Sequence, residues 1–128
     1  MKVNLDTTIF YVQDVERLKS FYTTIFEVEI LEEYEATWVL LKAGNGKIGF
    51  HKIGAEYWDE SKGGFKFDNN TKIVFEINED IHEMRDVLLT QQVAMREVKT
   101  FEGYGYWLCD GEDPEGNVFQ LKQQKEIR

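Results

Sequence analysis

Two heptapeptides, TTIFYVQ at residues 7–13 and KIVFEIN at residues 72–78, decide the fold. They align at an offset of 65 residues, about half of the 128-residue chain. Every second residue shares a face, Thr8, Phe10 and Val12 in the first and Ile73, Phe75 and Ile77 in the second, which is typical of a strand with one buried face. Asp14 and Asn78 follow these strands as expected helix N-caps, because a short polar side chain accepts from the first free N–H groups of a helix. Similarity at this spacing indicates an internal duplication.

The same order of elements, β-α-β-β-β, is predicted in both halves. In the first half we expect strands at residues 5–12, 28–33, 37–41 and 47–52 and a helix at residues 15–25. In the second half we expect strands at residues 72–77, 94–101, 104–109 and 118–122, a helix with an apolar stripe of Ile81, Met84, Val87 and Leu88, and a turn at residues 110–117. The chain is therefore predicted to be one α+β domain, residues 1–128, made of two repeats at about 1–52 and 71–125, joined by a long loop at 53–70.

Two such units can pair their sheets into a curved, half-open barrel of mixed β-sheet with the helices outside. If Phe10, Val12, Phe75 and Ile77 face the helices, side chains of the opposite parity must line the concave face. These residues are Thr7, Ile9, Tyr11, Lys72, Val74 and Glu76.

Composition and charge exclude several functions. The formal charge of -9 and the absence of a basic stripe make nucleic acid a poor partner. No apolar run is long enough for a membrane span, so we expect no membrane partner. The acidic balance fits a cationic ligand, although a charge that simply keeps the protein soluble is the preferred interpretation. Cys109 is the only cysteine, which fits the cytoplasm and a small buried residue in a strand.

Three stretches resemble the glyoxalase/bleomycin-resistance/dioxygenase proteins, also called the vicinal oxygen chelate superfamily. They are YVQDVERLKSFYTTIF, VFEINEDIHEM and GYGYWLCDGEDPEGNVFQL, the last with an Asp-Pro-Glu-Gly-Asn turn before the final strand. Glu27 departs from the pattern, because the family usually has a glycine after the first helix. The resemblance implies the fold described above and, for the bleomycin-resistance branch, a homodimer of bacterial type.

Metal-dependent members of this superfamily hold one divalent ion with four side chains. Carried over by the resemblance, these positions fall on Thr7, Gly49, Lys72 and Gln120. None is a usual ligand: threonine is weak, glycine has no side chain, a lysine cation repels metal, and glutamine offers only an amide oxygen. We therefore expect no metal, no cofactor and no catalytic residue, although a misplaced gap would bring in His51.

A concave sheet without metal can still bind a ligand through aromatic stacking and a few polar anchors. Trp38 and Trp107 are candidates for stacking or for the core, Trp58 for a loop or lid role, and His82 for the solvated surface. For Glu76 we favour an ion pair with Lys72 over a shifted pKa, and His51 can be structural or face the cleft. The predicted ligand-binding set is Thr7, Tyr11, Trp38, His51, Lys72, Glu76, Trp107 and Gln120.

The favoured function is metal-free sequestration of a small organic molecule, such as a drug or toxic metabolite, by a homodimer. The alternative is a metal-dependent lyase, isomerase or dioxygenase with displaced ligands, for example His51, Glu76 and Glu56. A regulatory or assembly role with an unused cleft is the third hypothesis. Whether the enzyme alternative holds is left open by the sequence.

Overall fold

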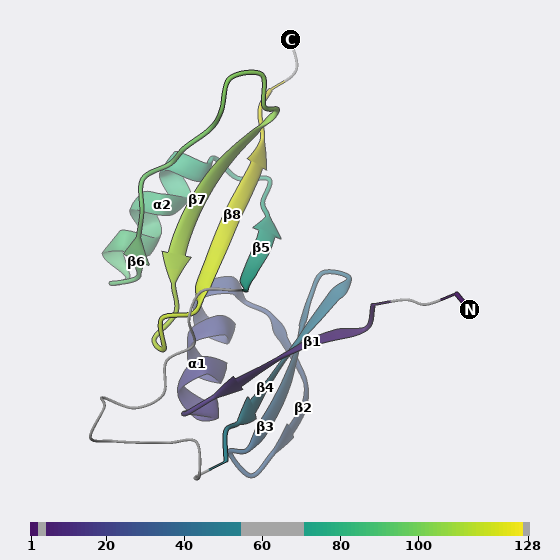
Figure 1. Ribbon diagram of the computed structural model, residues 1–128. Coiled ribbons are helices and arrows are strands. Elements are labelled where there is room, and N and C mark those ends of the chain that lie inside the picture. Colours follow the sequence, from purple (N-terminus) through teal and green to yellow (C-terminus); the bar gives the residue numbers. More distant parts are fainter. Residues whose placement is uncertain (3–4, 55–70, 127–128) are drawn as a thin grey trace. The chain divides into compact units, whose positions relative to one another are not determined.

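A computed structural model describes residues 1–2, 5–54 and 71–126 of the chain. The chain divides into two compact units, Met1–Lys66 and Phe67–Arg128, and each is described separately (Figure 1). The predicted loop at 53–70, with Glu56 and Trp58, lies almost entirely outside the described residues. Neither of the described helices is long and apolar enough to cross a membrane.

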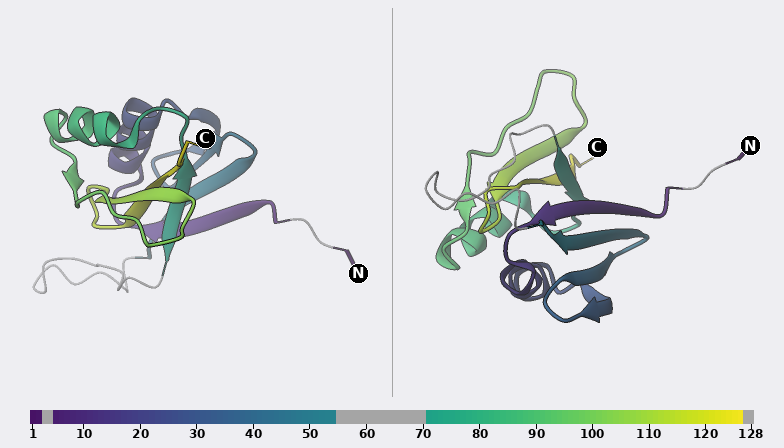
Figure 2. Two further views of the ribbon diagram at one scale, coloured as in Figure 1. Left: turned by 90° about the horizontal axis from the view of Figure 1, so that it is seen from above. Right: turned by 60° about the horizontal axis from the view of Figure 1, so that its bottom comes forward.

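The first unit is a four-stranded mixed sheet with one helix on one of its faces (Figures 1 and 2). Its elements are β1 (Thr7–Val12), α1 (Val15–Phe26), β2 (Glu29–Tyr34), β3 (Trp38–Ala43) and β4 (Gly46–Lys52). The strand order is β1-β4-β3-β2, with β1 parallel to β4 and the other neighbours antiparallel. The unit thus brings the first and last strands of one repeat side by side.

The helix α1 begins as predicted. Asp14 accepts a hydrogen bond from the backbone N–H of Arg17 at 3.0 Å, which satisfies one of the free donors of the first turn. Its apolar stripe includes Leu18 and Tyr22, both fully buried, and Tyr22 stacks on Phe50 of β4 at 5.0 Å between ring centroids. Burial of these large side chains on one face of the sheet stabilises the unit.

The second unit repeats this architecture. Its elements are β5 (Lys72–Glu76), α2 (Ile81–Thr90), β6 (Ala94–Met95), β7 (Tyr106–Glu112) and β8 (Val118–Gln124). The strand order β5-β8-β7-β6, with β5 parallel to β8, matches the order of the first unit. The helix α2 lies on the face that carries buried Cys109, Phe119 and Leu121. The predicted duplication is therefore visible in the connection of the strands.

Three predictions for the second unit are corrected. The N-cap of α2 is Asp80, whose side chain accepts from the N–H groups of His82 and Glu83 at 2.9 and 3.0 Å, and Asn78 lies two residues too early. The strand expected at 94–101 is reduced to Ala94–Met95 plus one isolated bridge between Lys99 and Leu108. The strand β7 continues to Glu112, three residues beyond the predicted end at 109.

The Asp-Pro-Glu-Gly-Asn turn follows β7. Asp113 is buried, and its carboxylate accepts from the backbone N–H groups of Glu115 and Asn117, each at 2.9 Å. Gly116 has a φ of 82°, a left-handed conformation that glycine adopts at little cost. The turn is thus closed by the side chain of its own first residue.

Candidate functional site

Each sheet has one face that its helix covers and one that its helix does not, here called the helix-free face. Strand partners point to the same side of a sheet and successive residues alternate, so the register assigns every side chain to a face. In the first unit, the helix-free face contains Thr7, Ile9, Tyr11, Trp38, Leu40, Lys47, Gly49 and His51. The predicted parity of β1 is confirmed, because Val12 is fully buried while Ile9 and Tyr11 are about half exposed.

Three aromatic residues form a row across this face, here called the aromatic row: Tyr11, His51 and Trp38 from β1, β4 and β3. His51 lies 5.6 Å from Tyr11 and 6.2 Å from Trp38 between ring centroids. The indole N–H of Trp38 donates to Glu32 at 3.2 Å, which orients the ring on the sheet. The row offers the flat, partly exposed surface on which aromatic or apolar groups stack.

The imidazole of His51 is held by its own strand end. Its Nδ1 lies 2.8 Å from the backbone carbonyl oxygen of Lys52. A carbonyl can only accept, so Nδ1 carries the proton of this hydrogen bond and Nε2 of the neutral ring keeps its lone pair. His51 therefore makes a structural hydrogen bond to its own strand through Nδ1.

Gly49 has no room for a side chain. A Cβ built at this position would lie 2.4 and 2.8 Å from two ring carbons of Trp38 and 3.3 Å from a side-chain carbon of Ile9. The Trp38 ring thus covers the position from which a metal ligand would extend in metal-dependent relatives. A side chain at position 49 would therefore force the Trp38 ring to move.

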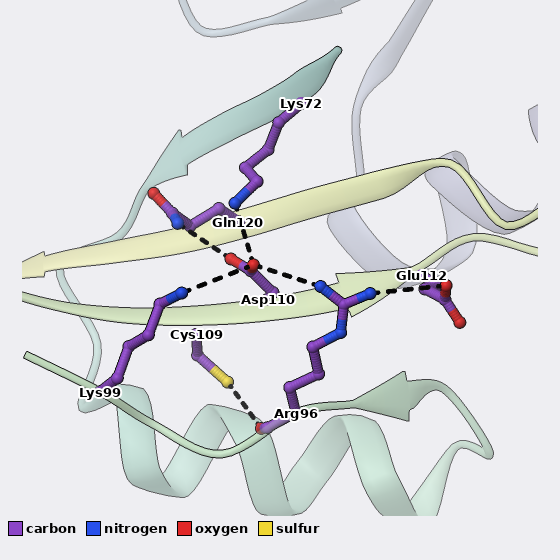
Figure 3. A network of polar contacts seen from close by, with 7 residues as sticks. All are labelled: Lys72, Arg96, Lys99, Cys109, Asp110, Glu112 and Gln120. Carbon is purple, nitrogen blue, oxygen red and sulfur yellow. Dashed lines mark hydrogen bonds and ion pairs between the residues drawn. The ribbon is translucent and has the colours of Figure 1, made fainter. Parts of the chain in front are cut away.

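The helix-free face of the second unit is built around a buried carboxylate, that of Asp110. Figure 3 shows side chains from different strands and from the segment after β6 converging on it. Its Oδ2 lies 2.9 Å from Nζ of Lys72, and its Oδ1 accepts from Nε2 of Gln120 at 2.9 Å. Nη1 of Arg96 lies 3.5 Å and Nζ of Lys99 3.9 Å from the same Oδ2. These five residues are here called the Asp110 cluster.

Asp110 is a stable anion. Its side chain is only 5% exposed. Burial by itself would raise the pKa of its carboxyl, but the hydrogen bonds from Lys72 and Gln120 and the charges of Lys72 and Lys99 outweigh burial and lower the pKa. The cations are far less buried: the side chains of Lys72, Arg96 and Lys99 are 40%, 53% and 48% exposed. One buried anion therefore holds three half-exposed cations together.

Sequence reasoning missed Asp110 because it assigned residues 110–117 to a turn. The strand β7 runs through Asp110 instead, paired with Gln120 of β8, and the pleat then points the carboxylate to the helix-free face. The signal that could have revealed the longer strand is the two-residue spacing of the charged residues Asp110 and Glu112 after Leu108, with the uncharged Cys109 and Gly111 between them.

The predicted ion pair between Lys72 and Glu76 is not formed. Four residues along one strand span about 13 Å, which is too far for these two side chains to meet. The ammonium of Lys72 instead reaches Asp110 of β7 across the intervening strand β8. Glu76 is nevertheless on the helix-free face with Lys72 and Gln120, as predicted.

Trp107 is the one predicted ligand-binding residue that does not lie on a helix-free face. Its ring lies 5.4 Å from that of His82 in α2, so it belongs to the helix-covered face, away from Lys72 and Gln120. His82 itself is exposed, which confirms its prediction as a surface residue. Cys109 is fully buried, as expected, and burial raises the pKa of its thiol, which makes it a poor nucleophile.

At three of the four positions that the superfamily resemblance assigns to metal ligands, other contacts take the place of a metal. The ring of Trp38 fills the space beside Gly49, the ammonium group of Lys72 is bound to Asp110, and the amide N–H of Gln120 donates to the same carboxylate. Within the part of the chain that the structure describes, no three His, Cys, Asp or Glu side chains are grouped so that they could hold a metal ion. Residues 5–54 and 71–126 thus do not fit the metal that the superfamily resemblance implies.

Comparison with solved structures tests the fold. The lactoylglutathione lyase from Agrobacterium tumefaciens matches with a TM-score of 0.74 and 13% identity over 95% of this chain and 94% of that chain. The fosfomycin resistance protein FosX from Listeria monocytogenes matches with a TM-score of 0.76 and 15% identity, over 98% and 96%. An integron cassette protein from V. cholerae matches with a TM-score of 0.72 and 19% identity, over 98% of both chains.

At the level of sequence there is no such match. No family model matches the chain, and neither does any curated protein sequence. At identities below 20%, the structural similarity establishes the architecture and leaves the activity open. The predicted fold class is confirmed: this chain has the glyoxalase/bleomycin-resistance fold.

Proposed function

We propose that this protein binds a small organic molecule on its helix-free faces without a catalytic metal. The observation that carries the proposal is that two positions assigned to metal ligands by the resemblance make other contacts. The Trp38 ring packs against Gly49, and the ammonium of Lys72 is bound to Asp110. Sequestration of a drug or toxic metabolite is the form of binding that we favour.

The aromatic row supports a ligand with a flat apolar part. Tyr11 is about half exposed although it lies on a sheet face beside His51 and Trp38. An exposed aromatic side chain loses apolar surface to water when a ligand ring covers it, and stacking contributes about 0.5–1.5 kcal/mol beyond that burial. Tyr11 is therefore the best residue with which to test binding.

The fluorescent dye N-phenyl-1-naphthylamine, which is flat and uncharged, is a suitable probe. We expect the protein to bind it, and Tyr11→Ala to weaken binding about threefold to tenfold, which corresponds to the loss of one stacking contact. Tyr104→Ala is the matched control, because Tyr104 is also partly exposed but belongs to the segment between β6 and β7 and is not a residue of the aromatic row. Failure of the dye to bind, or equal effects of the two variants, would contradict the aromatic row as the binding surface.

A metal-dependent lyase, isomerase or dioxygenase is the second candidate. It is favoured by one neighbour, the E126Q mutant of FosX from Listeria monocytogenes, which was solved in complex with Mn(II) and 1S,2S-dihydroxypropylphosphonic acid. In this chain, the ligand set of this candidate is His51, Glu76 and a carboxylate such as Glu56, of which Glu56 lies outside the described residues.

Elemental analysis separates the two candidates. The purified protein is incubated with Ni, Zn, Mn or Fe(II), desalted and analysed, in parallel with His51→Ala and the control His82→Ala. We expect no stoichiometric metal in any of the three proteins. Near-stoichiometric metal that is lost only in His51→Ala would overturn the metal-free proposal and favour the enzyme.

A further inference from the structure

The Asp110 cluster contains more positive than negative charge. Lys72, Arg96 and Lys99 surround Asp110, and the only other acid that the cluster contacts among the described residues is Glu112, 3.7 Å from Nη2 of Arg96. The whole chain has the opposite balance, with a formal charge of -9. Three cations against two carboxylates therefore make a local positive surface on an acidic protein.

The local charge governs which ligand is bound here. At physiological salt, interactions between exposed charges are largely screened beyond about 8 Å, so distant carboxylates contribute little at this face. The acidic balance of the whole chain favours a cationic ligand, whereas the charged groups within contact distance of the Asp110 cluster favour an anion.

The cluster also has the donors that an anion needs. An ammonium group has three N–H donors, and the ammonium of Lys72 uses one of them for Asp110 at 2.9 Å. Lys72 and Lys99 are both about half exposed, so water or a ligand can reach their remaining donors. Asp110 offsets the repulsion among the cations and fixes their positions before a ligand arrives, which lowers the entropic cost of binding.

An apolar surface adjoins these charges. Val74 of β5 is paired with Gln120 and is half exposed, although it is an aliphatic residue in the middle of a strand. A ligand with an acidic group on an apolar body would thus meet donors at the cluster and an aliphatic contact next to it.

We infer that the helix-free face of the second unit binds an organic anion, with the carboxylate, sulfonate or phosphonate group of the ligand hydrogen-bonded to Lys72 and Lys99. This inference rests on the proposed small-molecule binding and specifies its ligand class. Asp110 is the positioning residue, and the ammonium of Lys72 supplies positive charge at a position that the superfamily resemblance assigns to a metal ligand.

Two dyes that differ by one sulfonate group test this inference. The anion is 8-anilino-1-naphthalenesulfonate, and the uncharged counterpart is N-phenyl-1-naphthylamine. We expect the anionic dye to bind more tightly than the neutral dye. Lys72→Met should lower the affinity for the anionic dye about tenfold, which corresponds to about 1.4 kcal/mol for one charge-assisted hydrogen bond. The affinity for the neutral dye should not change. Raising the salt concentration should lower the affinity for the anionic dye only.

The matched control is Lys125→Met. Its ammonium lies 4.9 Å from the ring of Trp107, which belongs to the helix-covered face, so the variant removes the same charge from a different place. Lys99→Met is a second test variant in case Lys72→Met unfolds, because the side chain of Lys99 is 48% exposed and 3.9 Å from Asp110. Thermal unfolding of each variant is measured alongside, so that dye binding to unfolded chain is recognised.

The outcomes separate this inference from the proposed function. Tighter binding of the anion that is lost in Lys72→Met or Lys99→Met but kept in Lys125→Met would support it. Binding of the neutral dye without preference for the anion, or equal effects of Lys72→Met and Lys125→Met, would overturn the anion site and leave the proposed function intact. Absence of binding by both dyes would overturn both.

Discussion

At the scale of single residues, Asp110 and Gly49 determine what the two helix-free faces can do. The carboxylate of Asp110 accepts hydrogen bonds from Lys72 and Gln120, two of the positions that the superfamily resemblance assigns to a metal. The absence of a side chain at Gly49 leaves room for the Trp38 ring. The carboxylate of Asp110 and the missing side chain at Gly49 thus decide which groups lie on each helix-free face.

We expect Asp110→Asn to lower the free energy of unfolding by about 1–3 kcal/mol at pH 7, since it removes a buried partner of several charged groups. The lowered pKa of Asp110 means that its stabilisation is complete above the ordinary carboxyl pKa of 3.8 and is lost as the pH falls through the folded-state pKa. Urea unfolding at about pH 7, 5 and 3 should show a constant difference between wild type and variant at the first two and a smaller one at the third.

The control for this experiment is Asp86→Asn, which changes an exposed carboxylate of α2. It should change the free energy of unfolding by less than about 0.5 kcal/mol at each pH. Equal stability of Asp110→Asn and wild type at pH 7 would show that the cluster contributes nothing to folding.

Gly49→Ala should destabilise the protein by about 1–3 kcal/mol, because its Cβ would lie 2.4 Å from a Trp38 ring carbon unless the ring moves. Gly105→Ala is the matched control, since a Cβ there meets no atom within 4 Å. Urea unfolding of both variants checks this, and unchanged stability of Gly49→Ala would mean that the Trp38 ring shifts freely.

At the scale of elements, strand ends and helix caps explain where the predicted fold was imprecise. The helix α2 begins after Asp80, which bonds the free N–H groups of both His82 and Glu83, so the capping geometry selects it over Asn78. The strand β7 extends to Glu112 because β8 and β6 both pair with its last residues. Pairing with distant strands, which a local pattern does not show, sets these limits.

Asp80→Ala should therefore cost about 1 kcal/mol of stability, the usual effect of removing an N-cap, while Asn78→Ala should cost less than about 0.5 kcal/mol. Thermal or urea unfolding of the two variants measures the difference. A larger loss for Asn78→Ala than for Asp80→Ala would place the start of the helix at the earlier residue.

At the scale of the whole molecule, the duplicated order of strands is the main result. The orders β1-β4-β3-β2 and β5-β8-β7-β6 are the same arrangement twice, and solved structures with this fold cover nearly the entire chain. The pairing of the two repeats into one half-open domain and the homodimer remain proposals from the resemblance, and the cytoplasmic location remains a proposal from the single cysteine.

The homodimer has a direct test. We expect light scattering at working concentration to give about twice the chain mass of 15.1 kDa. The same measurement on a dilution series would show the mass falling towards that of one chain if the interface is weak. A mass of 15.1 kDa at every concentration would contradict the dimer.

Sequence alone determined the duplicated β-α-β-β-β order, the parity of β1 and β5, the cap at Asp14 and the closing turn at Asp113, because each depends on residues close together in the chain. The tertiary structure decided the partner of Lys72, the face of Trp107 and the role of Asp110. These depend on which residues of separate strands are paired, and a shift of one residue in that register would turn every side chain to the opposite face.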